Sequence, residues 1–320
     1  MAPCCVMISM KGSDIKQIQN SRCLVAGGSG FIGSRVVDIL LDFGAKEVVI
    51  VGQTAGPVRA KDKRMRFFAC DLSRDGSALV IEKLGLFDYV FNLIGLIDQR
   101  MPHPKPDELF DANVRTLMNL SKGISWESVR GAVHTGSNAE HGLGSLPHAE
   151  NKNLEPTNMY GWSKATASLY AITMTKAGLE KWCVARPFFV YGPGKEVGFV
   201  PELIKALSQE KTFEISSDTT RDPIYVDDVA EGLVRLALCS EARGEVVNLC
   251  SGKEVAIKRI ADMVLRKIGK GNIVVKLNAR PGDMPRSRGS TKKLKALTGW
   301  SPSISLSDGL DKVIGGYENI

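Results

Sequence analysis

Tyr160 and Lys164 have the residue types and the spacing that move a proton to and from an alcohol oxygen. Residues four apart on a helix lie on one face, one turn from each other. A lysine ammonium beside a phenol lowers the pKa of the tyrosine, which then exchanges protons near neutral pH. Ser137, at the predicted end of a strand, is placed to hydrogen-bond the same substrate oxygen. Because Y-x-x-x-K also arises by chance, as a lysine beside a surface tyrosine, the elements around the motif decide its meaning.

A glycine-rich stretch upstream predicts a phosphate site. The apolar run Cys23–Ala26 is typical of a buried strand, and apolar residues at helical spacing continue to Phe43. The turn between them fits both G-x-G-x-x-G and G-x-x-G-x-x-G, through Gly27, Gly28, Gly30 and Gly33. A strand that turns through glycines into a helix directs backbone N–H groups and the positive helix end at one point, which attracts a dinucleotide's diphosphate. The alternative is an ordinary glycine-rich turn.

Strand and helix patterns alternate along the first half of the chain. This alternation predicts an α/β fold with a doubly wound parallel sheet. In such sheets ligands bind beyond the carboxyl ends of the strands, which is where Ser137 stands. The predicted strands are Cys23–Ala26, Glu47–Val51, Arg66–Ala69, Tyr89–Ile94 and Ala132–Thr135, with helical spacing at Asp107–Gly123 and after Tyr160.

The composition narrows the class of protein. With 320 residues, 43% of them apolar, the chain is long enough for one large domain or two interlocked ones. No apolar run reaches membrane-spanning length, and residues 1–10 lack a basic n-region, so we expect a cytoplasmic protein and no membrane partner. The seven cysteines and four histidines show no metal-ligand spacing. The net charge of +7 favours an anionic small molecule over nucleic acid, since no nucleic-acid motif accompanies it.

The end of the second predicted strand leaves the choice of dinucleotide open. An acidic side chain at this point usually accepts the ribose hydroxyls of NAD, but here Gly52 is followed by Gln53. Arg35, Arg59 and Lys61 are near enough in sequence to attract a 2′-phosphate, or are simply exposed. NADP is therefore expected as readily as NAD.

From Cys23 to about Trp300 the chain resembles the extended short-chain dehydrogenase/reductases. Within them it is similar to the NAD(P)-dependent nucleotide-sugar epimerase/dehydratase group, of the UDP-glucose 4-epimerase kind. The resemblance implies a Rossmann-type doubly wound sheet with a smaller, mixed α/β substrate-binding lobe. The stretches that carry it are Gly27–Gly33, Cys70–Leu72, Asn92–Gly95, Asn113–Val114, Ser137, Tyr160–Lys164, Arg186–Gly194, Arg221–Ala230, Arg280–Asp283 and Trp300–Pro302.

The resemblance also implies roles for single residues. The catalytic set is Ser137, Tyr160 and Lys164. The residues expected to bind the cofactor are Gly27, Gly30, Phe31, Ile32, Gly33, Arg35, Asp71, Leu72, Leu93, Ile94, Gly95, Asn113, Tyr160, Lys164 and Pro187. Those expected to bind the nucleotide-diphosphate sugar are Ser137, Asn138, Tyr160, Phe189, Arg221 and Arg280, the two arginines through their forks to the diphosphate.

The reaction implied is an epimerisation at a sugar carbon, by analogy C4. Tyr160 would take a proton from a hydroxyl while hydride leaves the same carbon for the nicotinamide. Several departures from the group affect this interpretation. Phe189 stands where asparagine is usual, and together with Gly52 and Arg35 it favours an alternative, an NADPH-dependent reductase of a nucleotide-linked 4-keto-6-deoxy sugar. Asn138 and Ala139 replace the acid and base of the dehydratases, which argues against 4,6-dehydration. A remote alternative is a non-catalytic NAD(P)-binding protein.

The resemblance finally implies a division of the chain. We expect a loose arm over residues 1–20 and a Rossmann domain over 21–187 and about 221–250. The substrate-binding lobe would comprise about 188–220 and 251–320. The helices after Asp107 and Tyr160 form the dimer face in this group, so a homodimer is expected.

Overall fold

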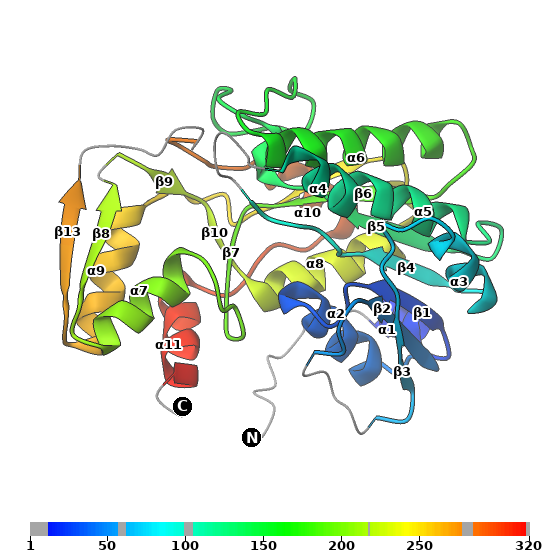
Figure 1. Cartoon of the computed structure of the whole chain (residues 1–320), viewed down its shortest axis with the longest axis horizontal. Coiled ribbons are helices and arrows are strands. Elements are labelled where there is room, and N and C mark those ends of the chain that lie inside the picture. The colour runs from blue at the N-terminus through cyan, green and yellow to red at the C-terminus, as the bar shows by residue number, and fades with distance from the viewer. Residues whose placement is uncertain (1–11, 57–61, 99–104, 217, 277–283, 318–320) are drawn as a thin grey trace.

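In the computed structural model the described residues are 12–56, 62–98, 105–216, 218–276 and 284–317. A large layered body and a smaller lobe lie side by side (Figure 1). The large body is built on a seven-stranded parallel sheet in the order β3-β2-β1-β4-β5-β6-β11. Its strands are β1 (Arg22–Ala26), β2 (Glu47–Gly52), β3 (Met65–Ala69), β4 (Tyr89–Asn92), β5 (Gly131–Thr135), β6 (Trp182–Pro187) and β11 (Val246–Leu249).

Successive residues of the central strand enter opposite layers of the core. Cys23 and Val25 pack with one group of helices, and Leu24 and Ala26 with the other, as the two-residue period of a strand requires. One face is covered by α1 (Gly12–Ile18), α2 (Phe31–Asp42) and α8 (Val226–Leu238). The other is covered by α3 (Ser77–Lys83), α5 (Thr116–Lys122) and α6 (Met159–Lys176). The predicted doubly wound sheet is therefore confirmed.

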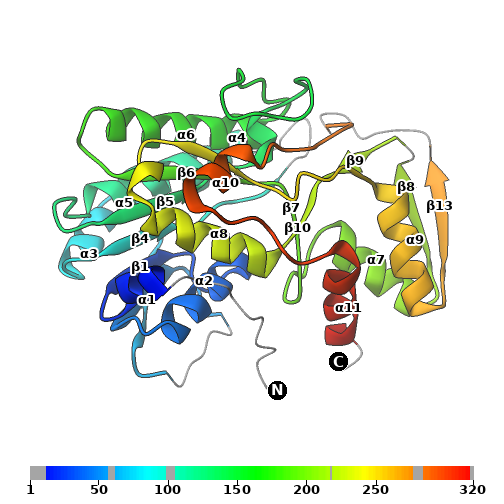
Figure 2. The ribbon, with the colours of Figure 1, turned by 180° about the vertical axis from the view of Figure 1, so that it is seen from behind.

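The smaller lobe has its own apolar core between helices and a short sheet (Figure 2). Strands far apart in sequence, β8 (Thr212–Ser216) and β13 (Asn272–Lys276), pair in parallel. The helices α7 (Phe199–Ser208), α9 (Ile257–Ile268) and α11 (Leu306–Tyr317) complete it. Two short pairs lie between lobe and sheet: β7 (Phe189–Tyr191) with β10 (Pro223–Tyr225), and β9 (Thr220–Arg221) with β12 (Val255–Ala256).

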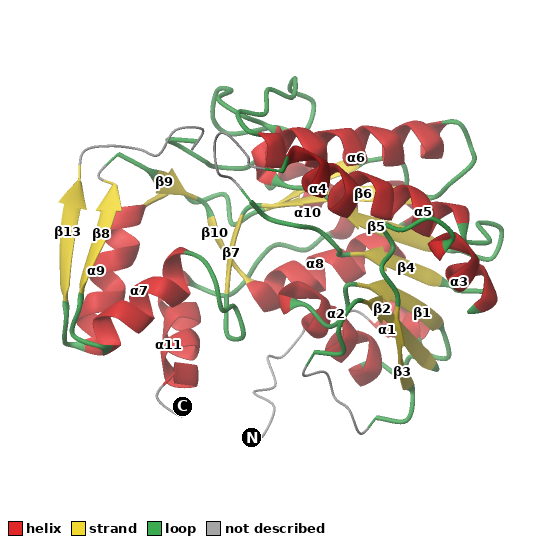
Figure 3. Cartoon of the chain, viewed as in Figure 1, coloured by secondary structure: helices red, strands yellow, loops and turns green. Residues whose placement is uncertain are grey.

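Three local features differ from the sequence-based expectation. Part of the expected loose arm is helix α1, because Ile18 is fully buried against the sheet layer and Asp14 pairs with Arg235. Helix α10 (Lys292–Thr298) falls in the expected lobe segment, yet its Leu294 packs in the core beneath α8 and β11. The expected helix Asp107–Gly123 is three pieces: α4 (Pro106–Phe110), the π-helical turn η1 (Asp111–Arg115) and α5 (Figure 3).

Two short 3-10 turns complete the described elements, η2 (Asn138–Glu140) after β5 and η3 (Ser240–Ala242) after α8. Among the residues that the structure describes, no helix is both long enough and apolar enough to cross a membrane.

Candidate active site

The glycine turn after β1 forms a cradle that a Cβ would fill. Gly27 has a φ of +81°, and a Cβ there would lie 2.9 Å from the backbone nitrogen of Ile94. A Cβ on Gly33 would collide with the carbonyl oxygen of Gly27, so helix α2 presses against the strand end. Gly30 caps this helix and supplies no side chain to its first turn. The backbone N–H groups of the first turn of α2 therefore have no capping side chain and are available to a ligand. The close approach of Gly33 to Gly27 fits the G-x-x-G-x-x-G alternative.

Residues at neighbouring strand ends frame the cradle. Leu93 and Ile94 follow β4, and their backbone atoms lie next to Gly27. Phe31 and Ile32 are the first two residues of helix α2. Pro187 ends β6 at the same edge of the sheet. Parallel strands place all these positions on the carboxyl edge, where the sequence predicts the cofactor.

Asp71, just after β3, holds a local turn and keeps its charge. Its carboxylate accepts from the Ser73 hydroxyl at 2.6 Å and from the Ser73 backbone N–H at 3.0 Å. Bonds from Ser73, Gln53 and Arg74 lower its pKa despite partial burial. Leu72 beside it is buried. Asp71 therefore holds the turn after β3 and adds a negative charge at this corner of the site.

Arg35 is engaged by two carboxylates. Its Nε lies 3.0 Å from Asp227 and its Nη1 lies 3.7 Å from Asp38. The expected role of attracting a 2′-phosphate is thus opposed by two nearby negative charges. The other basic residues predicted to help, Arg59 and Lys61, lie outside the described residues.

The serine and tyrosine that the sequence predicts to be catalytic lie together and are almost completely buried. Ser137 is 6% exposed and Tyr160 is 5% exposed. Ser137 follows β5 and caps the turn η2, where its Oγ accepts from the backbone N–H of Ala139 at 3.1 Å. Tyr160 stands in the first turn of α6, and a hydrogen bond joins its phenol to Ser137. The structure therefore brings together the two oxygens that sequence analysis paired.

Lys164 lies one turn further along α6 and reaches across the carboxyl edge of the sheet. Its Nζ donates to the carbonyl oxygen of Thr135 at 3.0 Å. A Cβ on Gly95 would lie 2.7 Å from this Nζ, so the glycine leaves room for the ammonium. Asn113, in the π turn, donates to the Ser163 hydroxyl at 2.9 Å and so ties this edge to α6. π turns occur frequently at functional sites.

The proton affinities differ from the sequence-based expectation. Burial raises the pKa of Tyr160 to about 12, with a further rise from Glu140, and the bond from Ser137 only partly offsets them. Burial lowers the pKa of Lys164 to about 8. The prediction that Lys164 lowers the pKa of the phenol is therefore wrong for the ligand-free protein, since desolvation sets the direction of the shift and Glu140, a negative charge, adds to it.

The lysine makes a testable contribution to stability. Its pKa falls from 10.5 to about 8 on folding, so the ammonium costs about 3 kcal/mol below pH 8. Between pH 8 and 10.5 the unfolded chain binds more protons, and stability rises with pH. We expect Lys164→Met to unfold at higher urea than wild type at pH 7, with the gap closing by pH 10.5. A difference in urea midpoint between the two proteins that does not change with pH would contradict a lowered pKa of Lys164.

The predicted substrate residues lie where the lobe meets the sheet edge. Asn138 donates to the Ser287 hydroxyl at 3.1 Å, which joins the catalytic turn to a distant segment. Phe189 packs against Phe199 with ring centroids 6.4 Å apart. The Nη1 of Arg221 donates to two carbonyl oxygens, those of Thr220 and Met284, both at 2.8 Å. Arg280 lies outside the described residues.

Sequence analysis missed four polar side chains of this region. Glu140 and Arg186 form a buried ion pair beneath Ser137, and the S-x-x-E spacing of a capping box would have indicated the first of them. The buried Thr135 Oγ1 has no hydrogen-bond partner within the described part of the chain. Lys195 donates to the carbonyl oxygen of Val190 at 2.8 Å, with its Nζ 5.6 Å from the ring centroid of Phe31. No local pattern marks the last two.

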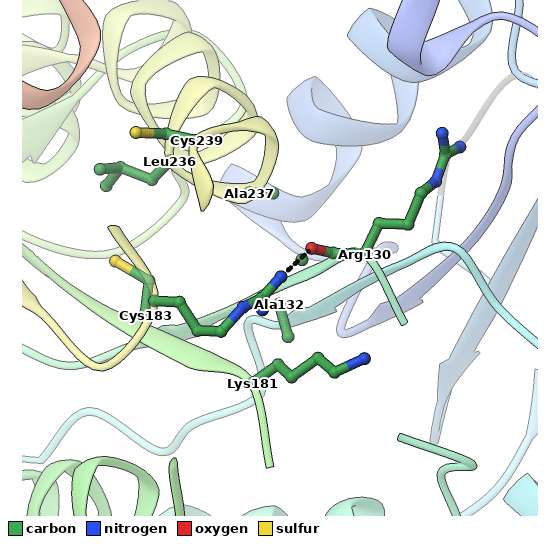
Figure 4. Close-up of a pocket in the computed structure, with 9 residues that line it drawn as sticks. Arg130, Ala132, Lys181, Cys183, Leu236, Ala237 and Cys239 are labelled. Atoms are coloured by element: carbon green, nitrogen blue, oxygen red, sulfur yellow. Dashed lines mark hydrogen bonds between the residues drawn. The ribbon is translucent and has the colours of Figure 1, made fainter. Parts of the chain in front are cut away.

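A small hollow lies at the opposite end of the sheet, where β5 and β6 begin, beside Arg130 (Figure 4). Arg243 also lines it and donates to the carbonyl oxygen of Arg130 at 2.9 Å. Lys181 also lines it, but it has no room for a water molecule. Because it lies at the amino ends of the strands, it is separate from the catalytic residues.

Comparison with known proteins adds a family and relatives. Residues 23–250 match the model of the NAD dependent epimerase/dehydratase family. The UDP-glucose 4-epimerase of Mycolicibacterium smegmatis is 27% identical and is matched over 93% of this chain and 99% of its own. The UDP-glucuronate 4-epimerase of Thermodesulfobacterium geofontis is also 27% identical, over 93% and 96%. The structure of MoeE5 in complex with UDP-glucose and NAD is 25% identical, with a TM-score of 0.84 over 93% of this chain and 99% of that one.

Proposed function

This chain belongs to the NAD dependent epimerase/dehydratase family, and on that premise we propose that it interconverts the C4 epimers of a nucleotide sugar. The observation that carries the proposal is one site. Tyr160 hydrogen-bonds Ser137, and Lys164, one turn further along α6, donates to the carbonyl oxygen of Thr135 at the carboxyl edge of the sheet. The glycine cradle at the same edge supports a dinucleotide as the cofactor. The names of the relatives support a UDP-linked hexose or hexuronate as substrate.

The residues present fit a dinucleotide. Gly27 and Gly33 leave the volume that a diphosphate needs against the N-terminus of α2. Lys164 and the Thr135 Oγ1, which has no hydrogen-bond partner among the described residues, would hold the nicotinamide end. When bound, NAD would supply a hydride acceptor that later returns the hydride to the same carbon.

The protein side chains would then handle the proton. Tyr160 would act as the phenolate: it would accept the proton of the C4 hydroxyl and return that proton to the oxygen after the keto sugar has rotated to present its other face. Ser137 donates a hydrogen bond to the same oxygen and holds it in place. Burial disfavours the phenolate form of Tyr160. The ammonium of Lys164 must therefore stabilise that phenolate while the proton is transferred. Burial of both side chains keeps bulk water from competing for the proton.

We propose NAD rather than NADP as the resident cofactor. Asp71 keeps its negative charge near the end of β2, and Arg35 is occupied by Asp227 and Asp38. Among the described residues, a 2′-phosphate at this corner would meet the carboxylates of Asp71, Asp38 and Asp227 and an Arg35 already paired with the last two. We expect NAD to bind at least about tenfold more tightly than NADP, which corresponds to about 1.4 kcal/mol. Titrations of the protein with NAD and with NADP at the same ionic strength measure the two Kd values. A Kd for NADP equal to or lower than that for NAD would refute the proposed preference.

We also propose that two copies pair through α4 and α6. Trp162 and Leu169 are 43% and 59% exposed on α6, and the ring of Phe110 on α4 lies 6.1 Å from that of Trp162. Large exposed side chains of this kind mark an interface.

The experiment that tests the function is equilibration of the purified protein with UDP-glucose and, separately, with UDP-glucuronate in the presence of NAD. We expect the C4 epimer to accumulate without net NADH. Net oxidation of NADPH with a nucleotide-linked 4-keto sugar, and no epimerisation, would favour the reductase instead.

A further inference from the structure

A buried ion pair lies directly under the catalytic serine. Glu140 is fully buried and Arg186 is 3% exposed. Their closest atoms, Oε2 of the glutamate and Nε of the arginine, are 2.7 Å apart. Glu140 belongs to the turn η2 and Arg186 to strand β6, so the pair joins the catalytic loop to the sheet.

The other carboxylate oxygen of Glu140 holds the backbone of Ser137. Its Oε1 accepts from the Ser137 N–H at 2.7 Å and from the Ser168 hydroxyl of α6 at 3.0 Å. Helix α6 also carries Tyr160, so one carboxylate connects the serine to the element that presents the tyrosine. A Cβ on Gly136 would collide with this Oε1, so the carboxylate packs against the backbone just before the serine.

The arrangement leaves the serine hydroxyl oriented. Ser137 Oγ accepts from the backbone N–H of Ala139 at 3.1 Å. That bond occupies an acceptor position of the oxygen, so its hydrogen is directed away from the turn, and Tyr160 is its other hydrogen-bond partner. The orientation depends on the capping box in which Ser137 and Glu140 exchange hydrogen bonds.

Stability alone gives a weak reason for burying these charges. A buried ion pair often contributes no more to stability than an apolar pair of equal volume. Here Arg186 Nη1 is also buried without a hydrogen-bond partner in the described part of the chain. The pair therefore carries a desolvation cost at the point where the serine must be oriented.

We propose that Glu140, fixed by Arg186, is a positioning residue that holds the Ser137 hydroxyl toward the substrate oxygen shared with Tyr160. The inference deepens the proposed function and rests on it for the identity of that oxygen. The hydrogen-bonded arrangement itself does not depend on the reaction. It can therefore be tested with and without turnover.

The first test is amide hydrogen exchange in the ligand-free protein. In Glu140→Gln the amide nitrogen cannot accept from Arg186, so the side chain cannot serve both partners. We expect the Ser137 amide to exchange about 10-fold or more faster, as for loss of a charge-assisted bond. The matched control is Glu231→Gln, which breaks another buried pair, with Arg235 at 2.7 Å on α8. Unchanged exchange at Ser137, or an equal change in the control, would overturn the proposal.

The second test is a double-mutant cycle in turnover with Ser137→Ala. Glu140→Gln should lower kcat by about 100-fold with KM and the NAD Kd within about threefold, since the loss is one of orientation. In the Ser137→Ala background the same change should have less than about a threefold effect, because no hydroxyl remains to orient. Effects that multiply would overturn the proposal. If wild type epimerises no nucleotide sugar, the proposed function fails and the exchange test alone decides the positioning role.

Discussion

Replacing Tyr160 with phenylalanine is expected to lower kcat for C4 epimerisation by about 10³-fold or more. Loss of a positioned acid–base group costs about 10²–10⁴-fold, and Ser137 cannot substitute, because its hydroxyl is far less acidic. Tyr160 is buried beside Ser137, and a phenylalanine ring in its place can keep the same packing contacts. The unfolding midpoint and the Kd for NAD should therefore change little. Steady-state turnover, thermal unfolding and NAD titration check the three quantities on one preparation.

A matched control for this variant is Tyr170→Phe on the same helix. Tyr170 donates to Glu180 at 3.0 Å, away from the serine, so its loss should leave kcat within about twofold, as expected for a single hydrogen bond outside the site. If Tyr160→Phe keeps more than about a tenth of wild-type turnover, the tyrosine is not the acid–base group.

The second large effect is expected for Gly33→Ala in the cradle. An added Cβ would meet the carbonyl oxygen of Gly27, and it would lie 2.8 Å from the carbonyl carbon. Both atoms belong to the backbone, so helix α2 must move away from β1. Overpacking of this kind costs about 1–3 kcal/mol, and the displaced helix end no longer meets the diphosphate. We expect the Kd for NAD to rise about 100-fold or more and the protein to unfold earlier in urea.

Gly316→Ala is the control for the glycine variant. Gly316 lies in α11, and nothing is within 4 Å of the position that its Cβ would take. Alanine in a helix should maintain or slightly raise stability and leave NAD binding unchanged. Equal NAD affinity in Gly33→Ala and wild type would show that the cradle does not bind the dinucleotide.

Local patterns predicted the parts of the site that depend on local geometry. The glycine spacing and the helical repeat of Tyr160 and Lys164 are set within one turn of chain, so sequence sufficed for both. The sequence also predicted the parallel sheet, because strands and helices alternate with regular spacing. Only the structure distinguishes between the two glycine patterns, since a Cβ on Gly27 or Gly33 would meet backbone atoms, whereas the atoms nearest to a Cβ on Gly28 belong to the side chains of Ile50 and Val25.

Features that depend on burial or on distant partners were not predictable in this way. The pKa of Tyr160 is raised rather than lowered, because desolvation is a property of the folded core. The pairing of Glu140 with Arg186 joins residues 46 apart in sequence. The sequence left open whether Arg35 attracts a 2′-phosphate or is simply exposed, and it could not show that Asp227, on the helix packed against α2, forms an ion pair with it. Each of these outcomes depends on which elements pack together.

The most direct test of the central claim follows the hydride. UDP-glucose carrying deuterium at C4 is incubated with the protein and NAD, and the UDP-galactose formed is analysed by NMR and mass spectrometry. The account predicts that deuterium remains at C4 of the epimer and that no net NADH appears, because the hydride leaves and returns within one site. Deuterium replaced by hydrogen from water, or stoichiometric transfer of it to released dinucleotide without an epimer, would contradict the account.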